Sequence, residues 1–521
     1  MSGFVPNFAS GLGVSYDRTE PMIGAFVTLQ VFRKWGDSWL VDVVAGALES
    51  WNDWAWEHRR GDGAFVGPDR KADLIVLGSD PNAAPGGVIG GFNTMQAARY
   101  ESGLDNSPMY DGVDQDSQGV GPVRFDNIST HKMELYDVGM TSLFLSDTAA
   151  LIELATARGN TALVAKLTPR LARVTAALNA RLWKPDGGPA GRGLYVNALY
   201  NGSFYERNSP TALFPLISGA ASPAQADALA TFAASPRGLC MNTSHTPIAA
   251  GVEYVSSWYD GKHDSAQCVS AACTRAVVDA AVVPEHTYAY VRVEGTVLPL
   301  TGGPGVGLVQ LSTWYSASRN DYALTNSSTL PPDAAGGYQF VRAEGWCWAA
   351  PPTGEGGSWP TTPLSLWYSA SRSDYKTCGT SACEAGGGGY LSRGVLCFSF
   401  DASTATSMPC LYGGNSIARE DAAFDDNSYW RGRVWGPQLM LQWWGLANPA
   451  YAGVQSVQDA RKSLVAQSRK LLLAEWSNFR RVAENYNGVI GVAEDVENAD
   501  PMYHWGALPA MMAILEDGKY L

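Results

Sequence analysis

The sequence predicts a mainly α-helical fold, a toroid of helical hairpins that is interrupted by a β-rich insertion. Apolar residues recur at helical spacing in about nine long segments on either side of residues 248–402. These segments follow one another in antiparallel succession, and polar motifs occupy alternate connections between them. Residues 248–402 lack this periodicity and are rich in Gly, Ser, Thr, Pro, aromatic and β-branched residues, which favours strands and turns.

The first expected helix has the clearest start. Thr19 can act as its N-cap, with Glu20 and Pro21 in the first turn, and the apolar pattern continues to about Lys34. Residues 61–100 are rich in loops. The remaining expected helices span residues 39–60, 134–158, 161–183, 210–217, 222–234, 430–447, 456–484 and 504–517.

The β-rich insertion repeats internally. Residues 314–322 read WYSASRNDY and residues 367–375 read WYSASRSDY, and a weaker copy begins at Trp258. The strand-like segments that follow the copies begin at Tyr288, Tyr338 and Tyr390. Three β-rich copies of this length predict a pseudo-threefold module. The repeated aromatic residues either fill one core position per copy or form a glycan-binding surface, and the sequence leaves both alternatives open.

The eight cysteines all fall within one segment of the chain. They are Cys240, Cys268, Cys273, Cys347, Cys378, Cys383, Cys397 and Cys410. This arrangement is typical of local disulfides that form in an oxidising compartment. Cys240 and Cys410 flank the insertion, and a bond between them would close its neck if their Cα atoms lie within about 7 Å.

The predicted location is the secretory pathway or the extracellular space. Besides the cysteines, the sequence has N-glycosylation sequons at Asn127, Asn201, Asn242 and Asn326. The first 30 residues lack a basic start followed by an apolar core, so no signal peptide is visible. We therefore expect the natural chain to extend upstream of Met1.

The composition excludes several classes of protein. The 37 basic and 50 acidic residues give a net charge of −13, and no basic cluster marks a nucleic-acid footprint. No apolar run reaches the roughly 18 residues of a membrane span. The six histidines show no metal-ligand spacing, and there is no Gly-x-Ser-x-Gly nucleophile motif. We expect no nucleic-acid partner, no membrane span, and neither a metal nor another cofactor.

Three polar motifs, far apart in the sequence, carry groups suited to acid–base chemistry on sugars. Residues 101–108 read ESGLDNSP, and Pro108 opposes a continuing helix, so Glu101 and Asp105 lie on irregular backbone. Residues 429–435 read YWRGRVW and combine forked guanidinium donors with stacking indoles. Glu484 stands where a long helix gives way to a polar turn, in ENYN.

Together with Arg18 in DRTEP (residues 17–21) and the closing HWGA (residues 504–507), these motifs resemble the signature set of glycoside hydrolase family 63. That family includes processing α-glucosidase I (mannosyl-oligosaccharide glucosidase), bacterial α-glucosidases and mannosylglycerate hydrolases. The resemblance covers residues 1–247 and 411–521. It implies an (α/α)6 catalytic barrel and hydrolysis with inversion of configuration.

The resemblance also implies a division of roles between the acids. Asp105 would be the general acid and Glu484 the general base, with the two carboxyls roughly 6.5–9.5 Å apart to admit a water. Glu101 would support the site or bind a sugar hydroxyl. The residues expected to contact substrate are Arg18, Glu101, Tyr429, Trp430, Arg431, Arg433, Trp435, Tyr486 and Trp505. As alternatives, Arg433 would pair with a core carboxylate and Trp435 would lie in a helix core.

We expect residues 1–247 and 403–521 to form the two parts of the catalytic barrel, and residues 248–402 an inserted module with a glycan ligand as one alternative. The family has twelve barrel helices, so the toroid lacks its first helices. An oligosaccharide α-glucoside is the favoured substrate, because no basic cluster beyond Arg431 and Arg433 marks a carboxylate site. Mannosylglycerate or glucosylglycerate is the alternative substrate, and a catalytically inactive carbohydrate-binding protein is the alternative of another class.

Overall fold

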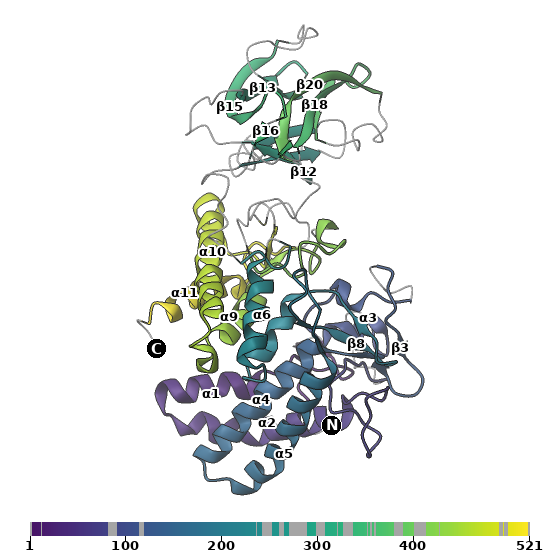
Figure 1. The fold of residues 1–521 in the computed structure, drawn as a ribbon, viewed down its shortest axis with the longest axis vertical. Helices are drawn as coiled ribbons and strands as arrows, with labels where there is room; N and C mark the ends of the chain where they lie inside the picture. The colour runs from purple at the N-terminus through teal and green to yellow at the C-terminus, as the bar shows by residue number, and fades with distance from the viewer. Residues whose placement is uncertain are drawn as a thin grey trace. The chain divides into compact units, whose positions relative to one another are not determined.

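The computed structural model describes residues 3–518 except 12, 82–90, 114–118, 236, 242–252, 260–264, 270–288, 298–307, 320, 327–336, 352, 355–356, 359–360, 380–388, 401–412, 427, 489–492 and 494–498. The chain forms two compact units, whose elements are labelled in Figure 1. The first unit comprises Met1–Asn242, Gly413–Lys470 and His504–Leu521, and the second comprises Thr243–Tyr412 and Leu471–Tyr503. The domain roles given above to residues 1–247, 248–402 and 403–521 stay predictions.

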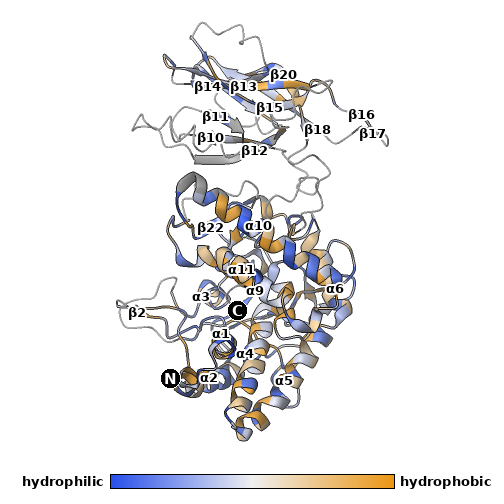
Figure 2. Ribbon diagram, turned by 90° about the vertical axis from the view of Figure 1, so that its left-hand side faces the viewer, coloured by the Kyte–Doolittle hydropathy of each residue, from blue (hydrophilic) through white to orange (hydrophobic). Residues whose placement is uncertain are grey.

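The first unit is built mainly of helices. Its α-helices are α1 (Gly24–Trp35), α2 (Ser38–His58), α3 (Met95–Tyr100), α4 (Val138–Ala157), α5 (Thr161–Arg181), α6 (Pro223–Ala234), α9 (Gly436–Leu446) and α11 (Leu508–Glu516), together with the start of α10 (Gln455–Phe479). Its 3₁₀ helices are η1 (Pro108–Tyr110), η2 (Pro210–Leu216), η5 (Phe424–Asp426), η6 (Pro449–Tyr451) and η7 (His504–Ala507). Surface helices such as α5 and α10 mix hydrophilic and hydrophobic residues along their length (Figure 2).

Short strands join these helices. They are β1 (Ala9–Ser10), β2 (Gly13–Val14), β3 (Phe125–Asp126), β4 (Lys132–Met133), β5 (Leu135–Tyr136), β6 (Trp183–Lys184), β7 (Leu194–Tyr195), β8 (Asn197–Leu199), β9 (Phe204–Tyr205) and β21 (Val434–Trp435). The antiparallel pairs are β1 with β2, β3 with β4, β6 with β7, and β8 with both β5 and β9. β22 (Asn485–Tyr486) belongs to the second unit.

Helix α4 forms the core of the first unit, where α1, α2, α5 and η2 pack against it (Figure 1). It is buried on nearly every face, and its hydroxyl side chains are satisfied inside the helix. Ser142, Ser146 and Thr148 each donate to the carbonyl four residues earlier, at 2.7–2.8 Å. Among the described residues, only α4 is long and apolar enough to cross a membrane, but 83% of that window is buried inside the protein, as in a core helix.

Several expected helix boundaries are wrong, for local reasons. Residues 430–435 are not helical, because Tyr429 and Gly432 have φ angles of 52° and 102°. The helix expected over 456–484 ends at Phe479, where Arg480 has a φ of 56°. The helix expected over 210–217 is the 3₁₀ helix η2, which has Pro215 inside it.

The start of the first helix was also predicted wrongly. Thr19 does not cap it, because its amide donates to Glu101 and its hydroxyl donates to the Val5 carbonyl. Instead α1 begins at Gly24 without a cap from its own preceding residue. The side chain of Asp147 in α4 caps α1 instead.

The Asp147 carboxylate caps α1 from a distant part of the sequence. Its Oδ1 accepts hydrogen bonds from Ala25 N at 2.6 Å and Phe26 N at 3.3 Å. These are amides of the first helical turn, which have no partner within the helix. Asp147 is fully buried, and this burial raises its pKa to about 7 despite the two donors.

We expect Asp147→Asn to remove a pH-dependent contribution to stability. In the native protein this group has a raised pKa, so its contribution is fully present below about pH 4 and is lost as the pH rises through about 7. The asparagine keeps an oxygen acceptor for the helix amides but does not ionise. The free energy of unfolding of the variant, relative to that of the wild type, should therefore increase between pH 4 and 8 by an amount on the order of 2–4 kcal/mol. Urea unfolding of both proteins at several pH values measures this; parallel stability curves would contradict it.

The second unit contains eleven described strands between residues 253 and 400. They are β10 (Glu253–Tyr259), β11 (Ser265–Val269), β12 (Ala289–Val297), β13 (Leu308–Ser316), β14 (Asp321–Asn326), β15 (Gln339–Trp348), β16 (Thr353–Gly354), β17 (Gly357–Ser358), β18 (Thr361–Ser369), β19 (Asp374–Cys378) and β20 (Tyr390–Phe400). Their order is β11-β10-β12 in one sheet, β14-β13-β15-β20-β18-β19 in another, and β16-β17 in a short ribbon. The three expected strand-like segments thus correspond to β12, β15 and β20.

The residues that repeat in the sequence connect strands to one another. Each WYSASR motif enters a hairpin turn, and its aspartate accepts a hydrogen bond from the tyrosine that starts the next strand-like segment. These pairs are Asp321 with Tyr338 and Asp374 with Tyr390. The buried Glu344 of RAEG accepts from Thr313 in the same way. These repeated side chains therefore have a packing role, which accords with the core alternative for them.

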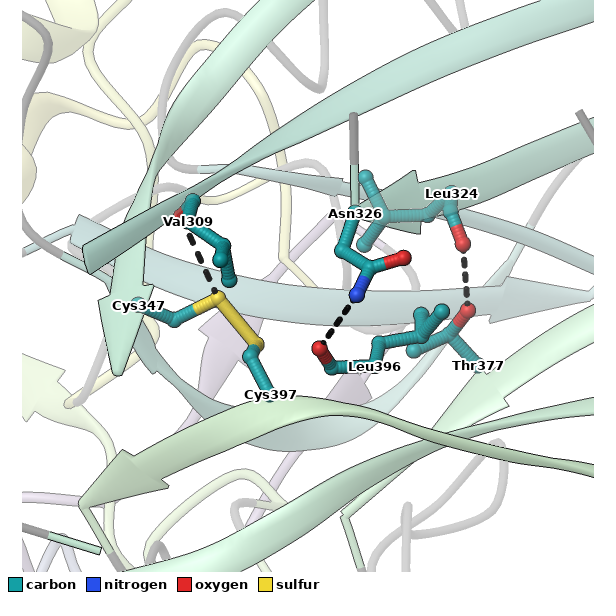
Figure 3. Close-up of a disulfide and its surroundings, with 7 residues drawn as sticks. All are labelled: Val309, Leu324, Asn326, Cys347, Thr377, Leu396 and Cys397. Atoms are coloured by element: carbon teal, nitrogen blue, oxygen red, sulfur yellow. Dashed lines mark hydrogen bonds between the residues drawn. A yellow bond between two sulfur atoms is a disulfide. The ribbon is translucent and has the colours of Figure 1, made fainter. Parts of the chain in front are cut away.

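Figure 3 shows how the strands of the larger sheet are linked beyond their backbone pairing. A disulfide joins Cys347 of β15 to Cys397 of β20. Asn326 donates to the Leu396 carbonyl at 2.7 Å. The described cysteines include none that is free, and Cys240 is disulfide-bonded, but Cys410 and the proposed Cys240–Cys410 bond lie outside the described residues.

Replacing both Cys347 and Cys397 by alanine should destabilise the second unit by about 2–4 kcal/mol, because the unfolded chain regains the freedom of the closed loop. Calorimetry should show a lower melting transition for this unit. A non-reduced tryptic digest of the wild type should yield the two linked peptides. An unchanged transition in the variant would contradict the prediction.

Candidate active site

The loop between α3 and η1 carries the two acids of the first motif. Thr94 caps α3 by accepting a backbone hydrogen bond, and Ser107 caps η1 in the same way. Pro108 stands at the start of η1, where no backbone donor is needed. Gly103 turns the chain between them with a φ of 67°, a conformation that favours glycine. The acid-bearing loop is thus fixed at both ends.

Glu101 lies in the protein interior with both carboxylate oxygens occupied. It is fully buried and accepts from Thr19 N at 2.9 Å and Gly78 N at 2.7 Å. Arg59 Nε lies 2.9 Å from its Oε1 and 3.0 Å from its Oε2. Burial lowers the pKa of Arg59, but Glu101 and Asp80 outweigh it and raise that pKa above its usual value. This geometry favours the supporting role of Glu101 over a contact with a sugar hydroxyl.

Arg18 is buried beside the start of the same loop. Its Nη1 donates to Asp17 at 3.1 Å and its Nε donates to Asn7 at 3.2 Å. Its guanidinium lies over the ring of Tyr100, 4.9 Å from the centroid. These contacts hold the N-terminal segment against the end of α3. The predicted contact of Arg18 with substrate stays a prediction.

Asp105 is half-buried, unlike Glu101 four residues earlier. Its backbone carbonyl accepts from Gln96 at 3.1 Å. The segment containing Glu20 lies against the same loop, because a Cβ on Gly103 would come within 3.3 Å of Pro21 Cγ. Burial, and then the charge of Asp105, raise the pKa of Glu20 to about 7. The charge of Asp105 therefore acts on the carboxyl of Glu20, a residue that the sequence had placed in a first helical turn.

Asn106 joins the first motif to the second, more than 320 residues later. Its Oδ1 accepts from Trp430 N at 2.7 Å, and its Nδ2 donates to the Ser428 carbonyl at 3.3 Å. Arg431 Nη1 lies 3.4 Å from the Asn106 carbonyl. The loop that holds Asp105 and the YWRGRVW segment are therefore direct neighbours.

Arg431 is ion-paired on two sides. Its Nη1 lies 3.0 Å from Asp111 Oδ1, and its Nε donates to Asp426 at 2.5 Å. Burial raises the pKa of Asp111, although Arg431, Arg207 and Arg99 all oppose that shift. Asp111 follows η1 directly, so this ion pair is a second tie between the two motifs. Contact of Arg431 with substrate stays a prediction.

Four of the predicted aromatic residues form one cluster in the first unit. The rings of Trp430 and Trp435 are stacked, with centroids 3.8 Å apart and planes at 7°. Tyr429 and Trp505 approach Trp435 edge-on, at 4.8 and 6.1 Å. Trp430 and Trp435 are buried, whereas Tyr429 and Trp505 are half-buried. Trp435 is fully buried at the end of β21, directly before α9. The half-buried rings are the better placed to meet a sugar.

The remaining predicted residues are placed as follows. Arg433 is fully buried, and its carbonyl accepts from Ser416 N at 2.8 Å. Glu484 lies in the second unit, where its backbone amide and Oε2 both pair with Asp500. Burial, followed by the charge of Glu475, raises the pKa of Tyr486. Because Asp105 and Glu484 belong to different units, the separation of their carboxyls stays a prediction.

The residues that anchor the C-terminal end of the loop were not predicted from the sequence. Asp137 caps α4 through Met140 N at 2.6 Å and accepts from the Tyr110 hydroxyl at 3.0 Å. An aspartate just before an apolar helix is an N-cap signal, which would have placed the helix start correctly. No local signal marks Arg59 or Asp111, because their partners are remote in sequence. The described residues hold no cluster of His, Cys, Asp or Glu suited to a metal ion.

A comparison with protein families identifies the family of the part of the chain that carries the first motif. Residues 5–262 match the family model described as mannosylglycerate hydrolase MGH1-like glycoside hydrolase domain. This part of the chain is a glycoside hydrolase domain of family 63. The family 63 domain contains Arg18, Glu101 and Asp105, and its helical glycosidase fold agrees with the helical first unit.

Solved structures give weak likenesses to the chain. An uncharacterised conserved protein from Thermus thermophilus has a TM-score of 0.44 and 13% identity, covering 95% of this chain and 77% of that chain. The family 63 mannosylglycerate hydrolase of the same organism, in complex with glucose, has a TM-score of 0.44 and 13% identity, covering 96% and 76%. Neutral trehalase from Saccharomyces cerevisiae has a TM-score of 0.28 and 12% identity, covering 43% and 46%. None of the curated proteins matches this chain.

Glu101→Gln should destabilise the first unit by about 3–5 kcal/mol, because it leaves the fully buried Arg59 without its full countercharge. Asp105→Asn is the matched control, since that half-buried residue has the same change of charge and should lower stability far less. Thermal unfolding of both variants provides the measurement. Equal melting temperatures would show that burial does not separate the two acids.

Proposed function

We propose that the protein is an inverting exo-glycosidase that hydrolyses α-glucosidic bonds of oligosaccharides. The observation that supports it most is the family 63 domain over residues 5–262, with Asp105 half-buried on a loop fixed at both ends. Asp105 is the general acid in this proposal and Glu484 the general base. Tyr429 and Trp505 have half-buried rings in the aromatic cluster around Trp435, and a sugar can stack on such rings.

The reaction follows from these roles. Asp105 gives its proton to the glycosidic oxygen as the bond to the anomeric carbon breaks. Glu484 takes a proton from water, whose oxygen attacks the same carbon from the opposite face. An α-glucoside then yields β-glucose first. This route requires the two carboxyls to stand roughly 6.5–9.5 Å apart, with the water between Glu484 and the sugar.

The ion pairs of the arginines near the loop favour a neutral substrate. Arg431 is paired with Asp111 and Asp426, and Arg207 donates to both oxygens of Asp421 at 2.7 and 2.8 Å. Their positive charge is already balanced within the protein, which disfavours capture of a substrate carboxylate. The match to the mannosylglycerate hydrolase MGH1-like domain favours the alternative, a mannosylglycerate or glucosylglycerate hydrolase.

The proposed architecture is an (α/α)6 toroid that carries the β-rich segment as an inserted pseudo-threefold module. Three of its strand pairs, β10–β12, β13–β15 and β18–β20, share register shifts at corresponding positions, which supports three related copies. We propose a secretory or extracellular location on the basis of the disulfides. Glycan binding by the module is a further proposal, and a glycan array with the full chain tests it.

Asp105→Asn should reduce turnover of an α-glucosyl oligosaccharide by roughly 10³-fold or more, because no proton is then delivered to the leaving oxygen. The decisive control is Glu101→Gln at a temperature where it stays folded. It should retain measurable turnover, since Glu101 has no exposed surface. If Glu101→Gln is inactive and Asp105→Asn is active, the two roles are reversed.

Proton NMR of the newly formed sugar should show the β-anomer first for an α-glucoside, and Glu484→Gln should abolish its formation. The same assay with mannosylglycerate and glucosylglycerate separates the substrate alternatives. First appearance of the α-anomer would contradict the inverting mechanism. A folded protein that binds sugars on an array but releases none would favour the inactive carbohydrate-binding alternative.

A further inference from the structure

The guanidinium of Arg431 lies against the loop that carries Asp105. Its Nη1 is 3.4 Å from the carbonyl oxygen of Asn106, the residue directly after Asp105. The amide of Trp430 donates to the Asn106 side chain at 2.7 Å, and the Asn106 amide donates to the Ser428 carbonyl at 3.3 Å. The segment that carries this cation is therefore fixed against the loop on both sides of Asn106.

Two aspartates neutralise Arg431, one from the interior and one from the surface. Asp111 Oδ1 and Oδ2 lie 3.0 and 3.1 Å from Arg431 Nη1, and the Asp111 side chain is 2% exposed. Asp426 Oδ2 accepts from Arg431 Nε at 2.5 Å, and the Asp426 side chain is 45% exposed. Asp111 is thus part of the packed interior, whereas Asp426 supplies its charge from the protein surface.

Asp111 does not balance Arg431 by itself, because a second guanidinium shares it. Arg207 Nη1 lies 3.9 Å from Asp111 Oδ2. Arg207 also donates to Asp421 at 2.7 and 2.8 Å, so these charges form a row in which acids and bases alternate. Asp426 stands at the end of this row and completes the neutralisation of Arg431.

We propose that Asp426 is a specificity-determining residue, which excludes a negatively charged leaving group by neutralising Arg431 beside the loop that carries Asp105. In a glycosylglycerate the carboxylate is bonded to the carbon that bears the glycosidic oxygen, so it lies close to the general acid when that acid meets the oxygen. Without Asp426, the guanidinium would offer this carboxylate an uncompensated charge and a forked donor. The inference rests on the proposed function, in which Asp105 is the general acid, and adds the residue that selects a neutral leaving group.

The first test compares two substrates that differ only in charge. Glucosylglycerate has a carboxylate where glucosylglycerol has a neutral CH₂OH group. The wild type should show the higher kcat/KM on glucosylglycerol. Asp426→Asn should move the ratio of the two values towards glucosylglycerate by roughly 10-fold or more, because the charge of Arg431 is then available to the carboxylate. A ratio that stays within about twofold of the wild type, or a wild type that prefers glucosylglycerate, would overturn the proposal.

Two control variants distinguish this effect from a general change of charge or packing. Asp426→Glu keeps the carboxylate and should keep the wild-type ratio. Glu420→Gln removes the same charge from the same segment, but Glu420 pairs with Arg237, at 2.9 Å, so the ratio should again stay as in the wild type. Higher salt should reduce the gain in Asp426→Asn, since exposed charges are screened. An equal gain in Glu420→Gln would contradict a local effect at Arg431.

The second test does not require turnover. Isothermal titration calorimetry measures the binding of both glucosides to Asp105→Asn and to the double variant that also contains Asp426→Asn. The double variant should bind glucosylglycerate, relative to glucosylglycerol, more tightly by roughly 10-fold. Melting temperatures of all variants show whether they are folded under the conditions of the measurement, and the exposed position of Asp426 predicts that they are.

These readouts separate two kinds of failure. If the wild type hydrolyses no glycoside but removal of Asp426 still favours binding of glucosylglycerate, the charge selection exists and the proposed function is wrong. If the protein hydrolyses glycosides but neither relative binding nor relative turnover depends on Asp426, the proposed function holds and the charge selection is refuted. Absence of binding of both glucosides to the folded variants would refute the selection as well.

Discussion

The buried ion pair between Arg59 and Glu101 is the interaction on which the candidate site depends. Arg59 ends α2, and Glu101 ends α3 and opens the acid loop. The same carboxylate holds the amides of Thr19 and Gly78, so four segments of the chain converge on one group. Gly78 must lack a side chain, since a Cβ there would stand 2.9 Å from the Arg59 guanidinium. A buried pair of this kind adds little net stability over an apolar core, but breaking it is costly. Its effect is to fix where the loop starts.

A second set of polar contacts fixes the other end of the loop. Tyr110 reaches Asp137 at the start of α4, and Asp111 pairs with Arg431 in the YWRGRVW segment. Asn106 adds backbone contacts to that segment on the loop itself. The acid loop is therefore held between the core helix and a motif remote in sequence. Asp105 stands between the two anchored ends, where it can face solvent or substrate without losing its position.

The sequence predicted the local features well and the long-range partners poorly. The loop that carries Glu101 and Asp105 is irregular backbone between α3 and η1, as expected, and the three strand-like segments form the strands β12, β15 and β20. The cap of α1 was missed because it comes from Asp147, on a helix more than 100 residues away. The helix expected from residue 430 was wrong because Tyr429 and Gly432 adopt positive φ angles, which apolar periodicity cannot reveal. Glu20 was expected in the first turn of a helix, but α1 begins only at Gly24.

Burial explains why two acids four residues apart can serve different purposes. Glu101 is fully buried, but its partners all donate to it, so its charge is matched inside the protein. Asp105 is half-buried, and its charge is the second cause, after burial, of the raised pKa of Glu20. Burial raises the pKa of Glu101, and Arg59 together with the two backbone donors opposes that shift. The half-buried position of Asp105 leaves part of its surface open, which a general acid needs in order to reach a substrate. The loop thus separates a fully buried carboxylate from a half-buried one across the turn at Gly103.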